Sequence, residues 1–348
     1  MSQGTRFDQE LREQPAALAR LLAQGREQAE AIAEAIRAAA PELVVIVARG
    51  SSHNAGRYAQ YLFGIRNRLP VAYAAPSMYT LYQQPPVLRR ALVIGISQSG
   101  QSPDVSAVME ESRRQGALTV AVTNDPASPL ARVADHCLPL HAGPEQAVAA
   151  TKTYTTQLLA LAMLSTALGG TAADWDALAA LPSAVAAALR LNADIVARAE
   201  RYRYARQFVV IGRGYNLATA WELALKIKEI TYIIAEPYSA AEFRHGPVAL
   251  IEPGFPVLLV APSGAAYGDT AALLALLEER GAEVIAISDQ AALLARARTA
   301  LPLPAGVSEW LSPLVAVVPG QLWAGALATV RGQDPDCPRG LRKVTYTH

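Results

Sequence analysis

The sequence predicts an α/β protein built on two parallel sheets, each covered by helices on both faces. Short apolar segments alternate with longer helix-like segments along most of the chain, which is typical of a parallel sheet with crossover helices. The pattern occurs twice with matching intervals, which indicates two copies of one five-stranded unit. A continuous apolar run at 91–96, followed by a Ser/Gly loop, has the character of a strand buried on both faces.

Composition places the chain among globular proteins. Its 348 residues are long for one core, and 52% hydrophobic content rules out general disorder. With 31 Lys+Arg against 30 Asp+Glu, no basic footprint for nucleic acid or an anionic membrane is present. Cys137 and Cys337 form no metal-binding or disulfide pattern, which fits a reducing cytosol. We therefore expect a cytoplasmic protein that needs no metal or organic cofactor.

Targeting and membrane segments are not expected. Residues 1–14 alternate charged and polar side chains and lack the apolar core of a signal peptide. The most apolar helical stretch, 158–168, is too short to span a bilayer and is interpreted as a core helix or a subunit interface.

The elements follow in a regular order. Helices are expected over 7–39, broken around Pro15 and Gly25, and a long helix is expected over about 151–168 before a looser Ala-rich stretch near 181–183. A mostly buried helix is expected over 216–230. The ten strands are expected at 43–47, 71–74, 91–96, 118–122, 137–140, 207–211, 236–238, 256–261, 283–287 and 299–303.

The strand intervals indicate an internal repeat. The first and third strands begin about 48 residues apart in one half (43 to 91) and about 49 apart in the other (207 to 256). The third and fourth begin about 27 apart in both (91 to 118, 256 to 283). We expect N-terminal helices at 1–40, a first domain at 41–185, a second at 195–335 and a tail at 336–348.

The loop after the third strand is a candidate phosphate site. Ser97, Gln98, Ser99 and Gly100 follow the strand, and Ser102 can cap a helix that begins with Pro103. Backbone N–H groups, hydroxyls and the positive end of the helix would then converge on one point, which suits a phosphate monoester. The Gly-Lys-Ser/Thr ending of a nucleotide-binding loop is missing, so a magnesium-bound triphosphate is disfavoured. The alternative is a plain Ser/Gly turn.

A second loop points to the same place. Arg49, Gly50 and Ser52 follow the first strand, and in a flavodoxin-like strand order the ligand lies beyond the carboxyl ends of strands one and three. Here too the alternative is a simple turn and helix cap. The equivalent loop in the second half, 262–265, has fewer hydroxyls, so only the first copy is expected to bind phosphate.

Candidate acids and bases lie in the second half. Glu222, Lys226 and Glu229 form one stripe on the helix at 216–230, either as a solvated salt-bridge ladder or with Glu229 as a proton-transfer base. His245 precedes a Gly-Pro pair, where a structural C-cap is the alternative. Lys343 lies in a tail that contains Pro and Gly, where a frayed basic tail is the alternative.

Taken together, these residues resemble a known family. Gly50-Ser51-Ser52, the loop at 97–102, Val148 to Lys152, Glu222 to Glu229, Glu242 to Pro247 and the Lys343 tail occur in the order found in the sugar isomerase (SIS) domains of glucosamine-6-phosphate synthase. The resemblance runs from about residue 7 to residue 343 and implies two tandem flavodoxin-like SIS domains, each a three-layer αβα sandwich.

The resemblance also implies roles for particular residues. Ser97, Gln98, Ser99 and Ser102 match the phosphate-binding loop, while Ser52 and the backbone at Val148 match sugar contacts. Glu229 matches the carboxylate that moves a proton between C1 and C2 of the open sugar, supported by Glu222 and Lys226. His245 matches a ring-opening histidine supplied by the neighbouring subunit, which implies a homodimer, and Lys343 in the tail matches an active-site lysine able to form a Schiff base.

Departures from the family separate the possible activities. The chain has only about 40 residues before the first predicted strand and no glutaminase segment there, Arg49 and Ala150 replace the usual residues, and no Ser follows Lys343. We therefore expect an isomerase or deaminase whose substrate is a hexose 6-phosphate. The expected sugars are glucosamine 6-phosphate and fructose 6-phosphate, and the expected reaction releases ammonia. The alternatives are a stand-alone isomerase or aminotransferase-type subunit, and a non-catalytic phosphosugar sensor.

Overall fold

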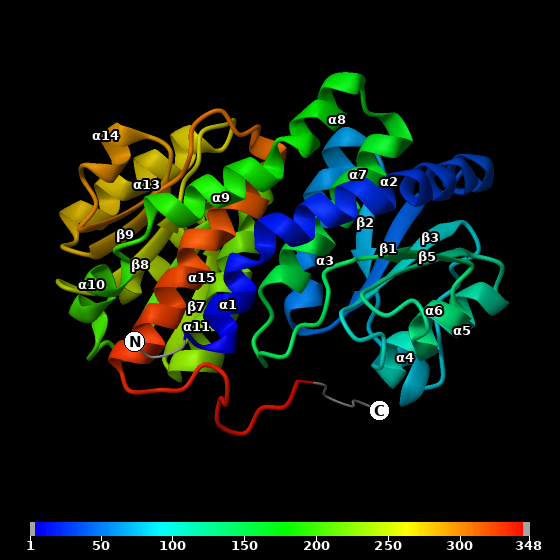
Figure 1. Cartoon of the computed structure of the whole chain (residues 1–348), viewed down its shortest axis with the longest axis horizontal. Coiled ribbons are helices and arrows are strands. Elements are labelled where there is room, and N and C mark those ends of the chain that lie inside the picture. Colours follow the sequence, from blue (N-terminus) through cyan, green and yellow to red (C-terminus); the bar gives the residue numbers. More distant parts are fainter. Residues whose placement is uncertain (1–3, 344–348) are drawn as a thin grey trace. The chain divides into compact units, whose positions relative to one another are not determined.

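The computed structural model describes residues 4–343, which form two compact units, each built around one five-stranded parallel sheet. The loop unit contains residues 16–145, 152–180 and 342–343, and is named for the loop at 97–102. The carboxylate unit contains residues 4–15, 146–151 and 181–341, and is named for Glu229. Both units therefore combine segments that are distant in the sequence (Figure 1).

The sheet of the loop unit has the order β2-β1-β3-β4-β5, with every neighbouring pair parallel. Its central strand β3 is buried along its whole length, as its continuous apolar sequence predicts. The strands are β1 (Leu43–Ala48), β2 (Val71–Tyr73), β3 (Ala91–Ser97), β4 (Leu118–Thr123) and β5 (His136–Pro139). The helices are α2 (Gln14–Ala39), α3 (Gly50–Arg66), α4 (Ser77–Thr80), α5 (Pro103–Arg114), α6 (Pro129–Val133), α7 (Lys152–Gly169) and α8 (Ala172–Ala179).

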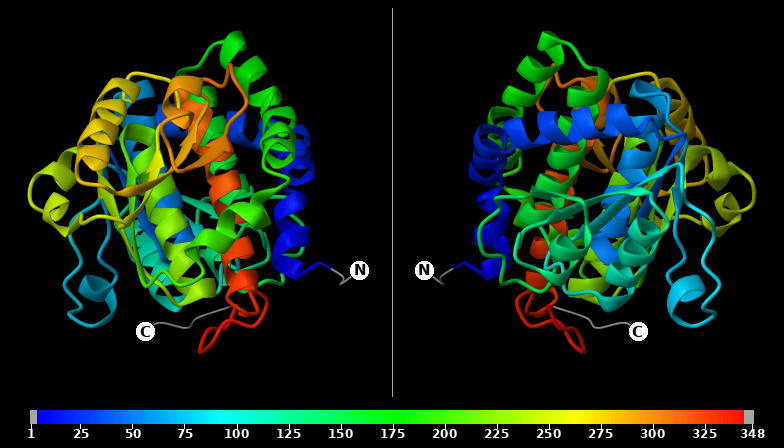
Figure 2. Two further views of the ribbon diagram at one scale, coloured as in Figure 1. Left: turned by 90° about the vertical axis from the view of Figure 1, so that its left-hand side faces the viewer. Right: turned by 90° about the vertical axis from the view of Figure 1, so that its right-hand side faces the viewer.

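Helices cover both faces of this sheet. Val45 and Val93 point to the face on which Val108 of α5 and Leu130 of α6 pack. On the opposite face α3 packs against β1 and α7, so the unit has three layers. The connection between β2 and β3, which includes α4, projects from its sheet as a long excursion (cyan, Figure 2).

The sheet of the carboxylate unit has the order β7-β6-β8-β9-β10, the same topology as the first sheet. The strands are β6 (Gln207–Gly212), β7 (Ile234–Ser239), β8 (Pro256–Val260), β9 (Glu283–Ser288) and β10 (Thr299–Pro302). The helices are α1 (Arg6–Arg12), α9 (Leu181–Leu191), α10 (Ile195–Ala199), α11 (Leu217–Thr231), α12 (Ala240–Arg244), α13 (Tyr267–Glu279), α14 (Ala291–Leu294) and α15 (Ser312–Val330). Short 3-10 turns are η1 (Glu200–Tyr202), η2 (Gly214–Asn216), η3 (Pro247–Leu250) and η4 (Glu309–Leu311).

The second sheet is also covered on both faces. Val209 and Leu259 face a cluster that includes Phe243 of α12 and Leu273 of α13. On the other face α11 packs against α15 and against β6 and β7. These observations confirm the expected fold class of two tandem flavodoxin-like units, with helices on both faces of each sheet and helices at the N-terminus. All ten strands begin and end within two residues of their predicted ends.

Two helical expectations were wrong, and one helix was not predicted. Helix α2 runs without a break through Gly25, because the chain there packs closely against Leu21 and Met163. Residues 181–191 form the helix α9, with Pro182 in its first turn, where no N–H is needed. Helix α15 was not predicted at all, since it is buried on nearly every side and so lacks the periodic polar face that signals a helix.

Among the described residues, one helix, within Glu309–Val330, is long and apolar enough to cross a membrane. A bent pair of helices, 172–191 and 195–202, would be a second candidate span if the pair is counted as one. In the fold, 83% of the apolar window of the first is buried. A core helix of a folded domain passes the same test, so this is weak evidence for a membrane span.

Candidate active site

The loop at 97–102 forms a compact turn at the carboxyl end of β3. Gly100 has a φ of +62°, and a Cβ there would lie 2.1 Å from the Oγ of Ser128, so only glycine fits. The backbone N–H of Asn124 donates to the carbonyl of Gln98 at 3.1 Å and ties the loop to the end of β4. The turn is therefore held in place by its neighbours.

The hydroxyls of Ser97 and Ser99 accept hydrogen bonds from the backbone of their own loop. The N–H groups of Gly100 and Gln101 donate to the hydroxyl oxygens of Ser97 (3.1 Å) and Ser99 (3.3 Å). These contacts use lone pairs of the serines, which leaves their hydroxyl protons for an anion. Ser102 occupies the N-cap position of α5 with Pro103 in the first turn, as predicted, but its side chain makes no capping hydrogen bond. Its hydroxyl is thus not committed to the helix.

Ser52 lies in the first turn of α3, after the neighbouring strand β1, and is only 8% exposed. Its hydroxyl accepts a hydrogen bond of 2.9 Å from the amide of Gln157, a buried residue of α7. Gln157 was not predicted as a site residue. Within the loop unit, the two loops singled out in the sequence both follow the carboxyl ends of adjacent strands, β1 and β3.

Val148 belongs to the carboxylate unit, within the segment 146–151. The buried carboxylate of Glu10 in α1 accepts the N–H groups of Gln146 at 2.5 Å and Ala147 at 3.0 Å. These bonds fix the backbone immediately before Val148. No sequence signal linked Glu10 to this segment, because 136 residues separate them.

Three of the four charged residues of α11, namely Glu222, Lys226 and Glu229, form a cluster of ion pairs. The side chains of Glu222 and Lys226 are 0% exposed, whereas that of Glu229 is 22% exposed. The Lys226 Nζ lies 2.5 Å from Oε2 of Glu229 and 3.5 Å from Oε1 of Glu222. The solvated ladder is therefore the wrong alternative. One carboxylate of the cluster reaches solvent while its neighbours are desolvated, an arrangement suited to a base that must meet a substrate.

His245 follows α12 as its C-cap residue and is exposed, with its N–H donating to the carbonyl of Glu242 at 2.9 Å. The C-cap position foreseen as its structural role is thus present. The preceding residue, Arg244, is fixed by the side chain of Asp269 at 2.8 Å and by the Asp269 carbonyl at 2.8 Å. In Figure 2 the segment that contains α12 (yellow-green) projects from its sheet.

The C-terminal segment up to Lys343 is anchored rather than frayed. The carboxylate of Asp336 accepts the N–H groups of Arg6 (2.8 Å) and Phe7 (2.9 Å) at the start of α1. The N–H of Arg339 donates to the hydroxyl of Tyr232 at 2.7 Å, and its guanidinium lies over the ring of that tyrosine. The frayed basic tail is therefore wrong for the residues that the structure describes.

Lys343 itself is held within the loop unit. Its Nζ lies 2.7 Å from Oε2 of Glu145, whose side chain is 0% exposed. The same carboxylate accepts the backbone N–H of Thr153 at 3.0 Å and its hydroxyl at 2.5 Å. Glu145 therefore fixes the position of the amine, a role that the sequence did not indicate.

The equivalent loop of the carboxylate unit is filled by the chain itself. The N–H groups of Ala265 and Ala266 donate to the carboxylate of Glu309 at 2.8 and 3.1 Å, and Asp289 accepts the N–H of Ser263 at 2.7 Å. A Cβ on Gly264 would lie 2.3 Å from the Glu309 carboxyl carbon. An internal carboxylate occupies the position at a helix start where an anion would bind.

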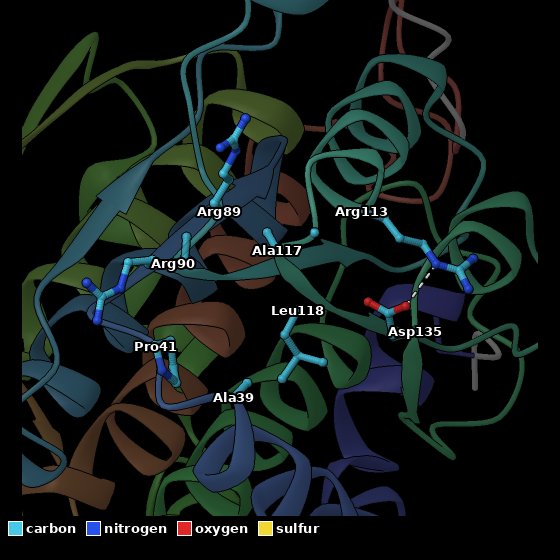
Figure 3. A pocket seen from close by; sticks show the side chains of 10 residues that line it. Ala39, Pro41, Arg89, Arg90, Arg113, Ala117, Leu118 and Asp135 are labelled. Carbon is cyan, nitrogen blue, oxygen red and sulfur yellow. Dashed lines mark ion pairs between the residues drawn. The ribbon is translucent and has the colours of Figure 1, made fainter.

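A hollow of about 420 Å³ lies at the opposite edge of the first sheet, where β3 and β4 begin. Figure 3 shows Arg89, Arg90 and Arg113 pointing away from one another around it. Two of the three are ion-paired, Arg90 with Glu42 and Arg113 with Asp135, each at 2.8 Å. The positive charges do not converge, so this hollow is not a second phosphate site.

The predicted site residues fall into two groups by unit. Ser52, the loop at 97–102 and Lys343 lie in the loop unit, while Val148, Glu222, Lys226, Glu229 and His245 lie in the carboxylate unit. Among residues 4–343, no group of three or more His, Cys, Asp or Glu side chains is placed to hold a metal ion.

Comparisons with known proteins agree with this arrangement. The SIS domain family model matches residues 40–167 and 202–331, one copy for each sheet. A glutamine–fructose-6-phosphate aminotransferase [isomerizing] from Thermococcus kodakarensis is 40% identical over an alignment of 344 positions, which covers 96% of this chain and 56% of that protein. The chain thus spans little more than half the length of that relative.

Solved structures match over nearly the full chain. A protein from Silicibacter pomeroyi DSS-3, assigned as a phosphosugar isomerase, has a TM-score of 0.87 and 38% identity, covering 96% of this chain and 100% of that one. The C-terminal domain of glucosamine-fructose-6-phosphate aminotransferase from Francisella tularensis has a TM-score of 0.88 and 29% identity, covering 97% and 99%. With two matched copies on two sheets of the same topology, the chain belongs to the SIS domain family.

Proposed function

We propose that this chain interconverts aldose and ketose forms of a hexose 6-phosphate, and that it converts glucosamine 6-phosphate and water to fructose 6-phosphate and ammonia. The observation that carries the proposal is Glu229, a partly exposed carboxylate on a cluster of buried charges. The relatives named glutamine–fructose-6-phosphate aminotransferase support this pair of sugars.

The proposed chemistry divides between the two units. The hydroxyls of Ser97, Ser99 and Ser102 hold the phosphate and so fix the open sugar. Glu229 removes the proton from C2 and returns it to C1, which converts the amino aldose to a ketimine with nitrogen on C2. One carboxylate is enough, because both carbons are neighbours.

Release of ammonia completes the reaction. Lys343 can attack the C2 carbon, displace ammonia and form its own imine, and water then returns the ketose and the free amine. The ion pair with Glu145 holds the amine in one place for this step. Glu222 and Lys226 support Glu229 from the buried side of α11.

We also propose that the active form is a homodimer in which His245 serves the site of the other copy as the ring-opening acid and base. His245 is exposed, and Leu250, five residues on, is 50% exposed. The projecting segment between β2 and β3 shows further apolar side chains, with Leu81 69% and Tyr82 73% exposed. Such apolar surface supports an interface between copies. Size-exclusion chromatography with light scattering should give twice the chain mass, and a monomer would contradict this assembly.

Incubation of the purified chain with glucosamine 6-phosphate, with ammonia and fructose 6-phosphate measured separately, tests the activity. Both products should form in equal amounts. Fructose 6-phosphate plus ammonium should give glucosamine 6-phosphate if the chain works in the synthetic direction. Binding of the sugar phosphate without either product would favour the non-catalytic sensor.

Ser99→Ala tests the role of the loop in the same assay. Loss of one hydrogen bond to a charged phosphate costs about 1.5–3 kcal/mol, so KM should rise at least about tenfold. Ser263→Ala, in the loop that is already filled by Glu309, is the matched control and should leave KM unchanged. Equal KM values for the two variants would contradict phosphate binding by the loop at 97–102.

A further inference from the structure

The same ion pair occurs at the same place in both repeats. Arg49 directly follows β1, and its Nε and Nη2 lie 2.8 and 2.6 Å from Oδ2 of Asp104, in the first turn of α5. Arg213 directly follows β6, and its Nη1 lies 3.1 Å from Oδ2 of Asp269, in the first turn of α13. Each arginine precedes a glycine of positive φ, so the two pairs are equivalent.

The surroundings of the two pairs differ. The side chain of Asp104 is 2% exposed, and its Oδ1 accepts the N–H of Val105 at 2.9 Å. Asp269 is 36% exposed and is shared between Arg213 and Arg244. Of the two aspartates, therefore, only Asp104 is a desolvated carboxylate that depends on the guanidinium of the neighbouring loop.

The pair in the loop unit joins the turn that carries the expected sugar contact Ser52 to the loop that carries the proposed phosphate ligands. Arg49 is the residue before the turn that contains Ser52, and Asp104 lies two residues after Ser102. Two of the three guanidinium nitrogens engage one carboxylate oxygen, which restrains direction as well as distance. A contact of this kind fixes the spacing between the turns before a ligand arrives.

We propose that Arg49 and Asp104 are positioning residues that hold the Ser52 turn against the loop at 97–102, and that they thereby set the affinity for the phosphate group of the substrate. The inference rests on the proposed function. It assigns to Arg49 a role through Asp104 rather than a direct contact with the sugar phosphate.

The competing explanation is direct attraction, since the Arg49 side chain is 52% exposed and carries the charge that a phosphate prefers. The two explanations predict opposite changes in phosphate affinity for the variant Asp104→Asn. Asp104→Asn weakens the hold on Arg49 and removes a negative charge near the ligand, so direct attraction predicts tighter binding. Positioning predicts weaker binding, because the turns lose their restraint.

The experiment measures KM and kcat with glucosamine 6-phosphate, and the dissociation constants of glucose 6-phosphate and inorganic phosphate by calorimetry. The variants are Arg49→Met, Arg49→Lys, Asp104→Asn and the double variant Arg49→Met with Asp104→Asn. Weakened hydrogen bonds to a charged phosphate cost about tenfold in affinity, so Arg49→Met should raise KM and both dissociation constants about tenfold with kcat within about twofold. Asp104→Asn should act in the same direction.

Two further results distinguish positioning from other roles. The double variant should bind no worse than Arg49→Met alone, because both changes break the same contact. Arg49→Lys should lie between wild type and Arg49→Met, since an ammonium cannot reproduce the forked contact. Arg213→Met, in the equivalent pair of the carboxylate unit, is the matched control and should leave phosphate affinity unchanged.

Tighter or unchanged binding by Asp104→Asn would overturn the inference, as would unchanged binding by Arg49→Met. An equal loss in Arg213→Met would also overturn it, since the effect would then be one of general stability. A wild-type chain that binds neither ligand would overturn the proposed function and this inference with it. Wild-type binding with unaltered Arg49 variants overturns the inference alone.

Discussion

Replacement of Lys226 by Met should destabilise the carboxylate unit strongly. The side chain of Lys226 is 0% exposed, with its ammonium 2.5 Å from Glu229 and 3.5 Å from Glu222. Methionine has a similar length and no charge. The variant therefore leaves Glu222, also 0% exposed, as a buried carboxylate without this cation.

The magnitude follows from the burial of the partners. Removal of one member of a buried ion pair costs about 3–5 kcal/mol, because the other charge stays desolvated. For a domain of 150–250 residues each kcal/mol lowers Tm by about 2–4 °C, so the fall should be about 6–20 °C. Glu229→Gln should cost less, about 1–2 kcal/mol, since Glu229 is 22% exposed and Lys226 keeps Glu222 as a partner.

Urea unfolding followed by circular dichroism measures these differences. The double variant with Glu222→Gln and Lys226→Met should recover at least half of the loss, because the fully buried side chain at position 222 then carries no charge. A Lys226→Met chain within about 1 kcal/mol of wild type would refute the reasoning. So would a double variant that is no more stable than Lys226→Met alone.

Three other predictions concern residues outside this cluster. Glu145→Gln should release the amine of Lys343 from its ion pair. Both kcat and the yield of a borohydride-trapped adduct on Lys343, measured by mass spectrometry, should then fall at least about tenfold. An unchanged yield would contradict the holding role of the ion pair. Glu309→Ala should lower the free energy of unfolding by about 1–2 kcal/mol, because two N–H groups at the start of α13 lose their acceptor. Glu309→Gln should lower it less. Stability equal to wild type in both variants would contradict this role of Glu309. Burial raises the pKa of the Cys137 thiol to about 11. Iodoacetamide at pH 8 should therefore label Cys137 far more slowly than the exposed Cys337, and the labelling rate of Cys137 should rise as the pH approaches 11. Comparable labelling rates of the two cysteines at pH 8 would contradict this prediction.

The strands and the loop at 97–102 could be predicted from the sequence because their signals are local. Each strand is a short apolar run that ends in a polar or turn-forming residue, and the same intervals occur twice. The loop at 97–102 carries its own signature of serines, glycine and a helix start. Helix α15 carries no such signal, since burial on nearly all sides removes the polar face that marks a helix.

The contacts that support the site were beyond sequence reasoning because they join distant residues. Lys343 and Glu145 are 198 residues apart, and Glu145 is a single acidic residue in an irregular loop. The burial of Lys226 and Glu222 depends on the elements that pack against α11, and one of these is α15, the helix that was not predicted. The pair of Arg49 and Asp104 did leave a signal, since arginine and aspartate recur at the equivalent positions of the second repeat.

Hydrogen exchange at the sugar carbons tests the central claim most directly. Glucose 6-phosphate or fructose 6-phosphate is incubated in D₂O with wild type and with Glu229→Gln, and deuterium at C1 and C2 is followed by proton NMR while calorimetry gives the dissociation constant. Removal of a general base costs about 10²–10⁴-fold. We predict that Glu229→Gln binds the sugar phosphate as wild type does and exchanges at least about 10²-fold more slowly. Exchange at the wild-type rate by a variant that still binds would contradict the account.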